Sequence, residues 1–134
     1  MARSSKAASG PKIMPHRGIN ALYAANIGLA AINAIRETFR DEDTIRVHPI
    51  ITHGGSQVNV IPADVRLEMY VRGKSIQAIA DADRKVDRAL RAGALALGAK
   101  VEIETLPGYM GMSMVRGARS QLCTPKTTIR AMNR

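Results

Sequence analysis

An alternation of apolar and polar residues in the stretch "DVRLEMYVR" constrains the fold more than any other feature. Val65, Leu67, Met69 and Val71 fall at every second position, and charged residues or a tyrosine stand between them. Because successive side chains of a strand point to opposite faces, the pattern predicts a strand with one buried and one wet face. The fold therefore contains a sheet that is covered on one side.

A second strand is predicted just before it, in "TIRVHPIITH". Ile45 and Val47 alternate with Arg46 and His48, which is typical of a half-buried strand. Pro49 has no N–H group to donate to a ladder, so the strand is expected at a sheet edge. The glycines of "GGSQ" form a turn that joins the two strands as an antiparallel pair.

The first helix is expected to open after Asn20, a good N-cap, and to run for about five turns. Asp41–Asp43 end it. Its expected core stripe consists of Leu22, Ala25, Leu29, Ile32 and Arg36, with Ile35 and Phe39 beside it.

Another face of this helix carries Asn26, Ala30 and Asn33. Small residues at helical spacing permit two interpretations. They form either a solvated polar face or a close helix–helix seam, since small side chains let backbones approach. The spacing alone leaves both open.

A second helix is predicted between Ser75, which can cap its start, and Gly98, which can end it. A further strand follows in "KVEIETLP" and stops at Pro107. The helix carries a core stripe of Ile79, Val86, Leu90, Gly93 and Leu97 and an expected wet face of Asp81, Asp83, Arg84, Asp87, Arg88 and Arg91.

The resulting order is helix, strand, strand, helix, strand. One more strand in front completes an α+β, ferredoxin-like βαββαβ sandwich, with two helices on one face of a four-stranded antiparallel sheet. Residues 1–14 occupy that slot as a basic flank and a poor, degenerate first strand. We expect the domain to span residues 15–110 and a basic, disordered tail to span residues 111–134.

The formal net charge of +9 lies wholly in the flanks. Residues 19–107 hold equal numbers of acidic and basic residues, so the folded part lacks the basic face typical of nucleic-acid binders. Aromatic residues make up only 3 % and tryptophan is absent, which disfavours base stacking. No apolar run is long enough for a membrane span or a secretory signal, so a cytoplasmic protein without nucleic-acid or membrane partners is expected.

Motifs that carry hydrolytic chemistry are lacking in the sequence. His16, His48 and His53 form no zinc-binding pattern, and Cys123 has no neighbouring base. What remains is Asn59 before the long strand and Arg72 at its end. Arginine suits a carboxylate and asparagine can add a hydrogen bond, although both residues are also ordinary at strand ends.

Two motifs occur together in this chain: "PHRGINA" before the first helix and "GGSQVNVIP" before the long strand. Together they closely resemble the lid, or dimerisation, domain of the zinc amidohydrolase, carboxypeptidase G and acetylornithine deacetylase metallopeptidase family, over residues 15–110. The resemblance implies a ferredoxin-like lid, inserted in a catalytic domain that holds two zinc ions and a glutamate base. It implies that two lids associate edge to edge, and that Asn59 and Arg72 bind the substrate carboxylate.

The resemblance therefore predicts a homodimer formed through the edge strand Ile45–Thr52 and the first helix, with a small carboxylate as ligand. Zinc is expected only in the catalytic domain, whose ligands this sequence lacks, so we expect no metal or catalytic residue here and no hydrolysis by this chain alone. The family's histidine before the "P-x-x-G" turn is also missing. The isolated lid, of the kind that a gene remnant would leave, is one reading, and a free-standing module that binds a small carboxylate or amino acid is the alternative.

Overall fold

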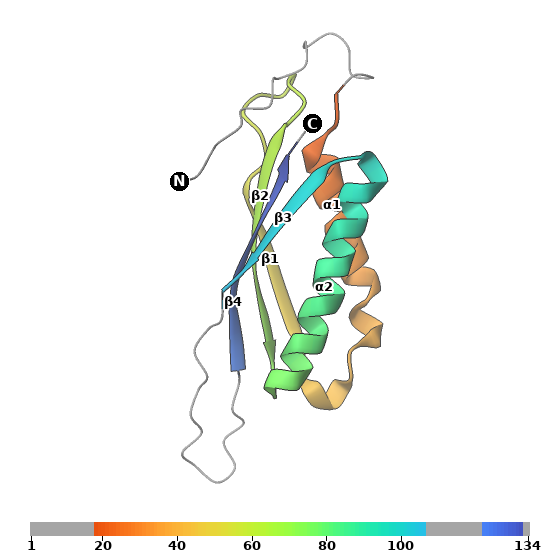
Figure 1. Ribbon diagram of the computed structural model, residues 1–134, viewed down its shortest axis with the longest axis vertical. Helices are drawn as coiled ribbons and strands as arrows, with labels where there is room; N and C mark the ends of the chain where they lie inside the picture. The colour runs from red at the N-terminus through yellow and green to blue at the C-terminus, as the bar shows by residue number, and fades with distance from the viewer. Residues whose placement is uncertain (1–17, 107–121, 133–134) are drawn as a thin grey trace.

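The computed structural model describes residues 18–106 in full and the backbone of residues 122–132 (Figure 1). Two helices, two short 3-10 turns and four strands follow one another in the order α1, η2, η3, β1, β2, α2, β3, β4. Their bounds are Ala21–Ala34, Arg36–Thr38, Asp41–Asp43, Arg46–His53, Asp64–Gly73, Ile76–Leu97, Lys100–Thr105 and Leu122–Met132. The predicted α+β class, with two helices and an antiparallel sheet, is confirmed.

The strands lie in the order β1-β2-β4-β3, and each pair of neighbours is antiparallel. Among the described strands β1 has a neighbour on one side only, in agreement with the edge position expected for the proline-containing strand. α1 and α2 pack side by side on one face of the sheet (Figure 1). None of the described elements covers the other face.

The alternation that predicted β2 is reproduced in its burial. Val65, Leu67, Met69 and Val71 are each at most 1 % exposed, because they point toward the helices. The intervening residues point to the open face, as the pattern requires. The core is completed by residues of both helices and of β1: Ala21, Ala25, Ile32, Val47, Ile79, Ala82, Val86, Ala89 and Leu90.

The predicted caps of both helices are confirmed. The backbone N–H groups of Leu22 and Tyr23 donate to Asn20 Oδ1 at 3.0 and 3.2 Å. The N–H of Ala78 donates to Ser75 Oγ at 3.2 Å, and Gly98 ends α2 in the left-handed region at φ 70°. Side-chain oxygens satisfy N–H groups that have no partner within a helix.

The first helix is shorter than predicted. It ends at Ala34, and the chain continues as a 3-10 turn in which Thr38 Oγ1 donates to the Ile35 carbonyl at 2.7 Å. The Arg36 guanidinium makes two hydrogen bonds: it donates to Asn33 Oδ1 at 3.0 Å and to the Val47 carbonyl at 3.3 Å. These local bonds compete with a continued helix, so the five-turn prediction was wrong.

Of the two interpretations of the face that carries Asn26, Ala30 and Asn33, the solvated one agrees with the structure, and the close helix–helix seam lies elsewhere. Asn26, Ala30 and Asn33 are exposed. The seam lies instead where Gly93 of α2 meets Ala24 and Gly28 of α1. A Cβ atom on Gly93 would lie 2.5 Å from both the Ala24 carbonyl oxygen and the Gly28 nitrogen. Glycine is therefore required for the two backbones to approach this closely.

Residues 122–132 differ from the expected disordered tail, because they form β4 between β2 and β3. A gap there would leave the backbone groups of both neighbouring strands without partners. The stretch "TTI" is rich in β-branched residues, which favour strands. Pro125 falls where the β2–β4 register shifts, a position that tolerates proline. The expected first strand in residues 1–14 and the other tail residues lie outside the described parts of the chain.

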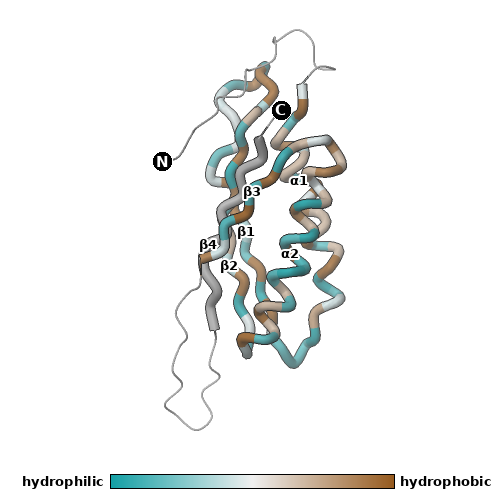
Figure 2. Tube along the Cα trace, viewed as in Figure 1, coloured by the Kyte–Doolittle hydropathy of each residue, from teal (hydrophilic) through white to brown (hydrophobic). Residues whose placement is uncertain are grey.

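The wet face predicted for α2 needs one correction. Asp83 and Asp87 are half-buried, beside the apolar stripe and not opposite it. Hydrophilic and hydrophobic stretches alternate along this helix (Figure 2). The prediction assigned every charged residue to solvent, whereas these two carboxylates lie at the flank of the packed face.

Candidate functional site

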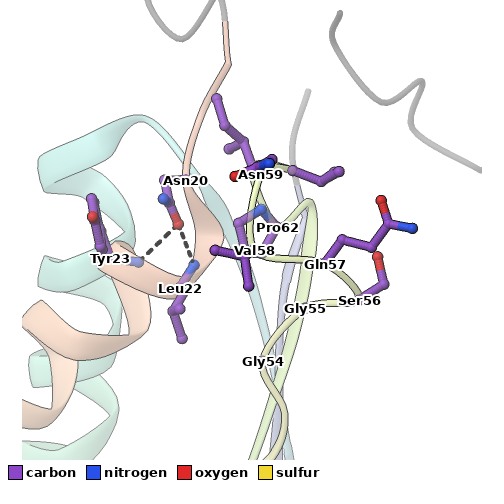
Figure 3. Close-up of a pocket in the computed structure, with 12 residues that line it drawn as sticks. Asn20, Leu22, Tyr23, Gly54, Gly55, Ser56, Gln57, Val58, Asn59 and Pro62 are labelled. Atoms are coloured by element: carbon purple, nitrogen blue, oxygen red, sulfur yellow. Dashed lines mark hydrogen bonds between the residues drawn. The ribbon is translucent and has the colours of Figure 1, made fainter. Parts of the chain in front are cut away.

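The connection between β1 and β2 builds a pocket with the start of α1. Residues 54–62 line one side, and Asn20, Leu22 and Tyr23 line the other, around a volume of about 610 Å³ (Figure 3). The N–H of Ala21 donates to the Pro62 carbonyl at 3.0 Å, which ties the helix start to the end of the connection. Asn20 therefore caps the helix and lines the pocket at the same time.

Asn59, the first residue predicted to bind a ligand, lies on this connection and lines the pocket. It is exposed, as is its neighbour Val58, which no described residue covers. Gly55 adopts φ 134°, a conformation that side chains rarely permit, so the turn before Asn59 depends on glycine. The pocket offers amide groups and apolar surface, with no charged side chain among its lining residues.

Arg72, the second predicted residue, lies near the opposite end of β2. It is exposed on the open face of the sheet, and its guanidinium carbon lies 5.5 Å from the centre of the Tyr70 ring. Its register partner in β1 is Arg46, while that of Tyr70 is His48. The alternation in the sequence already places Tyr70 and Arg72 on one face, whereas Arg46 as a neighbour of Arg72 was missed because only the strand register reveals it.

The structure does not bring Asn59 and Arg72 together within one chain. They are separated by nearly the whole of β2, and a strand rises by about 3.3 Å per residue, so the span from Asp64 to Arg72 alone is roughly 26 Å. One small carboxylate cannot touch both. Each residue therefore belongs to a different end of the domain, the first to a pocket and the second to an open basic surface.

Charged groups on α2 show the clearest electrostatic perturbations. Burial, with the nearby charge of Asp87, raises the pKa of Asp83. Burial also raises the pKa of Asp87, against the opposing charge of Arg91, and Asp87 Oδ1 is buried with no hydrogen-bond partner among the described residues. By contrast, hydrogen bonding and charge from Lys85, 2.9 Å away, lower the pKa of the exposed Asp81 despite an opposing desolvation effect.

Metal-binding clusters were not expected, and among the described residues no three His, Cys, Asp or Glu side chains gather where they could hold an ion. His48 and His53 lie on β1, apart from the acidic residues of α2, while His16 and Cys123 lie outside the described side chains. The described residues thus supply no zinc site, and the location of zinc stays a prediction. Neither described helix is long and apolar enough to cross a membrane.

Comparison with known proteins identifies the fold's relatives. Residues 11–97 match the family described as the peptidase dimerisation domain. The chain is 36 % identical to the Xaa-Arg dipeptidase of Mus musculus over 98 residues, and 37 % identical to that of Homo sapiens over 90 residues. These alignments cover 73 % and 67 % of this chain but 22 % and 20 % of the relatives, so it matches about a fifth of their length. The chain belongs to the peptidase dimerisation domain family.

Proposed function

We propose that this chain is a self-associating lid domain of a zinc-dependent amidohydrolase or peptidase, with the ferredoxin-like sandwich of such lids. The family match carries this proposal, and the likeness to two Xaa-Arg dipeptidases supports a peptidase as the enzyme to which the lid belongs. In this assignment zinc and the catalytic base belong to a catalytic domain. The lid contributes assembly and contacts to the substrate carboxylate, and it performs no hydrolysis alone.

The free edge of β1 supports self-association. An edge strand presents backbone N–H and C=O groups that can pair with a second copy of the same strand. Two apolar side chains of this strand are exposed, Ile50 at 60 % and Ile51 at 41 %. Two copies joined through β1 would extend the sheet across a two-fold axis, because the same patch meets itself.

The outward face of α1 supports the same interface. Tyr23 and Ile27 are 60 % and 39 % exposed, and the exposed Ala30 and Ala34 continue their row at helical spacing. Residues 21–34 contain no charged side chain. Exposed apolar groups that form a row mark interaction surfaces more often than isolated ones do. We call Tyr23, Ile27, Ala30, Ala34 and the β1 edge the association surface.

Asn59 and Arg72 take part in substrate binding under this proposal, in two different sites. Since they lie at opposite ends of β2, one domain can serve the active site of its own subunit with one residue and that of its partner with the other. Arg72 supplies a guanidinium fork for the carboxylate, and Asn59 supplies an amide. Any dipeptide carries such a carboxylate, so these contacts do not by themselves select the side chain.

The test is the oligomeric state of the chain and of two matched variants, measured by analytical ultracentrifugation. Ile27→Glu places a charge in the association surface, whereas Leu95→Glu places it on α2, where Leu95 is 82 % exposed. We expect a dimer whose dissociation constant rises about tenfold or more in Ile27→Glu, because a buried charge without a partner costs more than that factor. Leu95→Glu should associate like the parent chain.

A chain that stays monomeric at high micromolar concentration contradicts the proposal, as does equal weakening by both variants. If such a monomer still binds small carboxylates through Arg72, the alternative of a free-standing binding module is favoured.

A further inference from the structure

The open face of the sheet carries a small square of polar side chains at the end of β1 and β2. Arg46 stands opposite Arg72 in register, and His48 stands opposite Tyr70. All four are exposed, while Val47 and Val71 between them are buried. Since residues two apart on a strand share a face, the four side chains project to the same side. Directly opposed residues lie about 5 Å apart at their Cα atoms.

Two arginines directly opposite each other are an unfavourable cross-strand pair, because like charges repel. No ion pair within the described side chains involves either of them, although such pairs form elsewhere on the surface, as between Arg66 and Asp64 at 3.0 Å. Glu68, the nearest acidic residue on the same face of β2, precedes Arg72 by four positions, or roughly 13 Å. No ion pair with a described side chain therefore offsets the repulsion between Arg46 and Arg72.

The Arg72 guanidinium is also held in place. It lies over the Tyr70 ring at 5.5 Å, a distance at which cation and ring attract. A guanidinium that rests on a ring keeps its planar fork free for a bidentate contact. One guanidinium therefore has an aromatic neighbour, and a second positive group stands opposite it across the strand pair.

We propose that Arg46 and Arg72 together bind a ligand with two carboxylates, one for each guanidinium. The inference rests on the proposed function in taking Arg72 as a carboxylate contact, and it deepens that function by naming Arg46 as the residue that selects a second negative group. A ligand that carries a positive group in its place meets Arg46 and is disfavoured, so the proposed selectivity differs from the one that the name of the Xaa-Arg dipeptidases states. His48 and Tyr70 border the site and offer hydrogen bonds.

Three acids of equal chain length test the proposal: glutarate with two carboxylates, pentanoate with one, and 5-aminopentanoate with one carboxylate and one ammonium group. Each is titrated into the 134-residue chain, and binding is followed through the NMR signals of the arginine Nε–H groups. Glutarate should bind about tenfold tighter than pentanoate, and 5-aminopentanoate more weakly than pentanoate. Arg46→Gln should remove most of the difference in affinity between glutarate and pentanoate, while the affinity for pentanoate changes by no more than about twofold. The control is Arg66→Gln, on the same face of β2, which should change neither acid by more than about twofold.

Equal binding of glutarate and pentanoate overturns the inference, and so does an equal loss in Arg46→Gln and Arg66→Gln, since that reports the general charge of the surface. If glutarate and pentanoate bind equally and Arg72→Gln abolishes the binding of both, the inference fails while the carboxylate contact of the proposed function survives. If glutarate is selected by a chain that ultracentrifugation finds monomeric, the inference stands and the self-association fails.

Discussion

The two helices cover the same face of the sheet, but they differ in what they show to the outside. α1 carries no charged residue and presents tyrosine, isoleucine and alanine outward. α2 presents aspartates, arginines and a lysine, some of them joined in pairs such as Lys85 with Asp81 at 2.9 Å. A helix that exposes charge is suited to water, whereas one that exposes an apolar row is suited to a partner. The difference indicates which side of the domain associates.

The two halves of the sheet under these helices also differ in how their strands are connected along the chain. β1 and β2 form a hairpin from neighbouring parts of the chain, while β3 reaches β2 only through β4. Loss of β4 is therefore the change with the largest expected effect on stability. Removal of residues 122–134 separates β3 from the sheet and leaves β2 with a single strand neighbour.

We expect that truncated chain to lose its cooperative thermal unfolding transition. A small domain is stable by only about 5–15 kcal/mol, and the loss of two ladders exceeds that reserve. Circular dichroism and calorimetry measure the transition. Removal of residues 133–134 alone is the control and should leave it unchanged. A truncated chain that still unfolds cooperatively near the parent's midpoint would show that β4 is dispensable.

Substitutions in the seam between the helices are expected to change the free energy of unfolding by a smaller amount. In Gly93→Ala the new Cβ atom would meet backbone atoms of Ala24 and Gly28 at 2.5 Å, so the helices must separate. In Gly28→Ala the nearest atoms are those of Leu90 at 3.2 and 3.3 Å, which require a much smaller shift. Overpacking costs about 1–3 kcal/mol, while alanine gains up to about 1 kcal/mol over glycine in a helix.

Gly93→Ala should therefore lower the free energy of unfolding by about 2 kcal/mol, and Gly28→Ala by less than about 1 kcal/mol. Urea denaturation of both variants measures the difference. If the two variants are equally stable, or if Gly93→Ala is the more stable one, the close approach of the helices is not a constraint on this fold.

Local patterns predicted those parts of the fold whose cause is local. The alternation from Val65 to Val71, the caps at Asn20 and Ser75 and the edge position of the Pro49 strand all depend on residues that are near in sequence. Backbone geometry and side-chain periodicity suffice for such features. They are the features that sequence analysis recovers without any knowledge of packing.

Features that depend on distant parts of the chain were missed. β4 pairs with strands more than 15 residues away, and the lack of a sustained period in its sequence, with its basic composition, suggested a tail. The partners of Gly93 lie on another helix, and the opposition of Arg46 and Arg72 follows from a register that spans the turn between two strands. For the candidate site, the sequence with its family resemblance selected Asn59 and Arg72 and already placed one before the long strand and the other at its end. Arg46 as the neighbour of Arg72 across the strand pair followed only from the register.

The smallest expected effect is the pH dependence of stability that the aspartates of α2 contribute. On α2, burial raises the pKa values of Asp83 and Asp87 above their usual 3.8, so the folded state binds these protons more strongly than the unfolded state. The penalty for their ionised forms is absent below the unfolded value of 3.8 and is fully present once the pH exceeds the folded values. Stability attributable to this pair therefore falls as the pH rises through that window.

Asp87→Asn removes one ionised form and should raise the free energy of unfolding at pH 7 by about 0.5 kcal/mol, a value kept small because the group is only half-buried. The gain should disappear near pH 3, where the parent carboxyl is already protonated. Chemical denaturation at both pH values measures it. The matched control is Asp81→Asn on the same helix, where the lowered pKa predicts the opposite sign: a loss at pH 7 that vanishes in acid. Equal shifts of both variants at pH 7 would mean that the flank of α2 does not differ from its outer face.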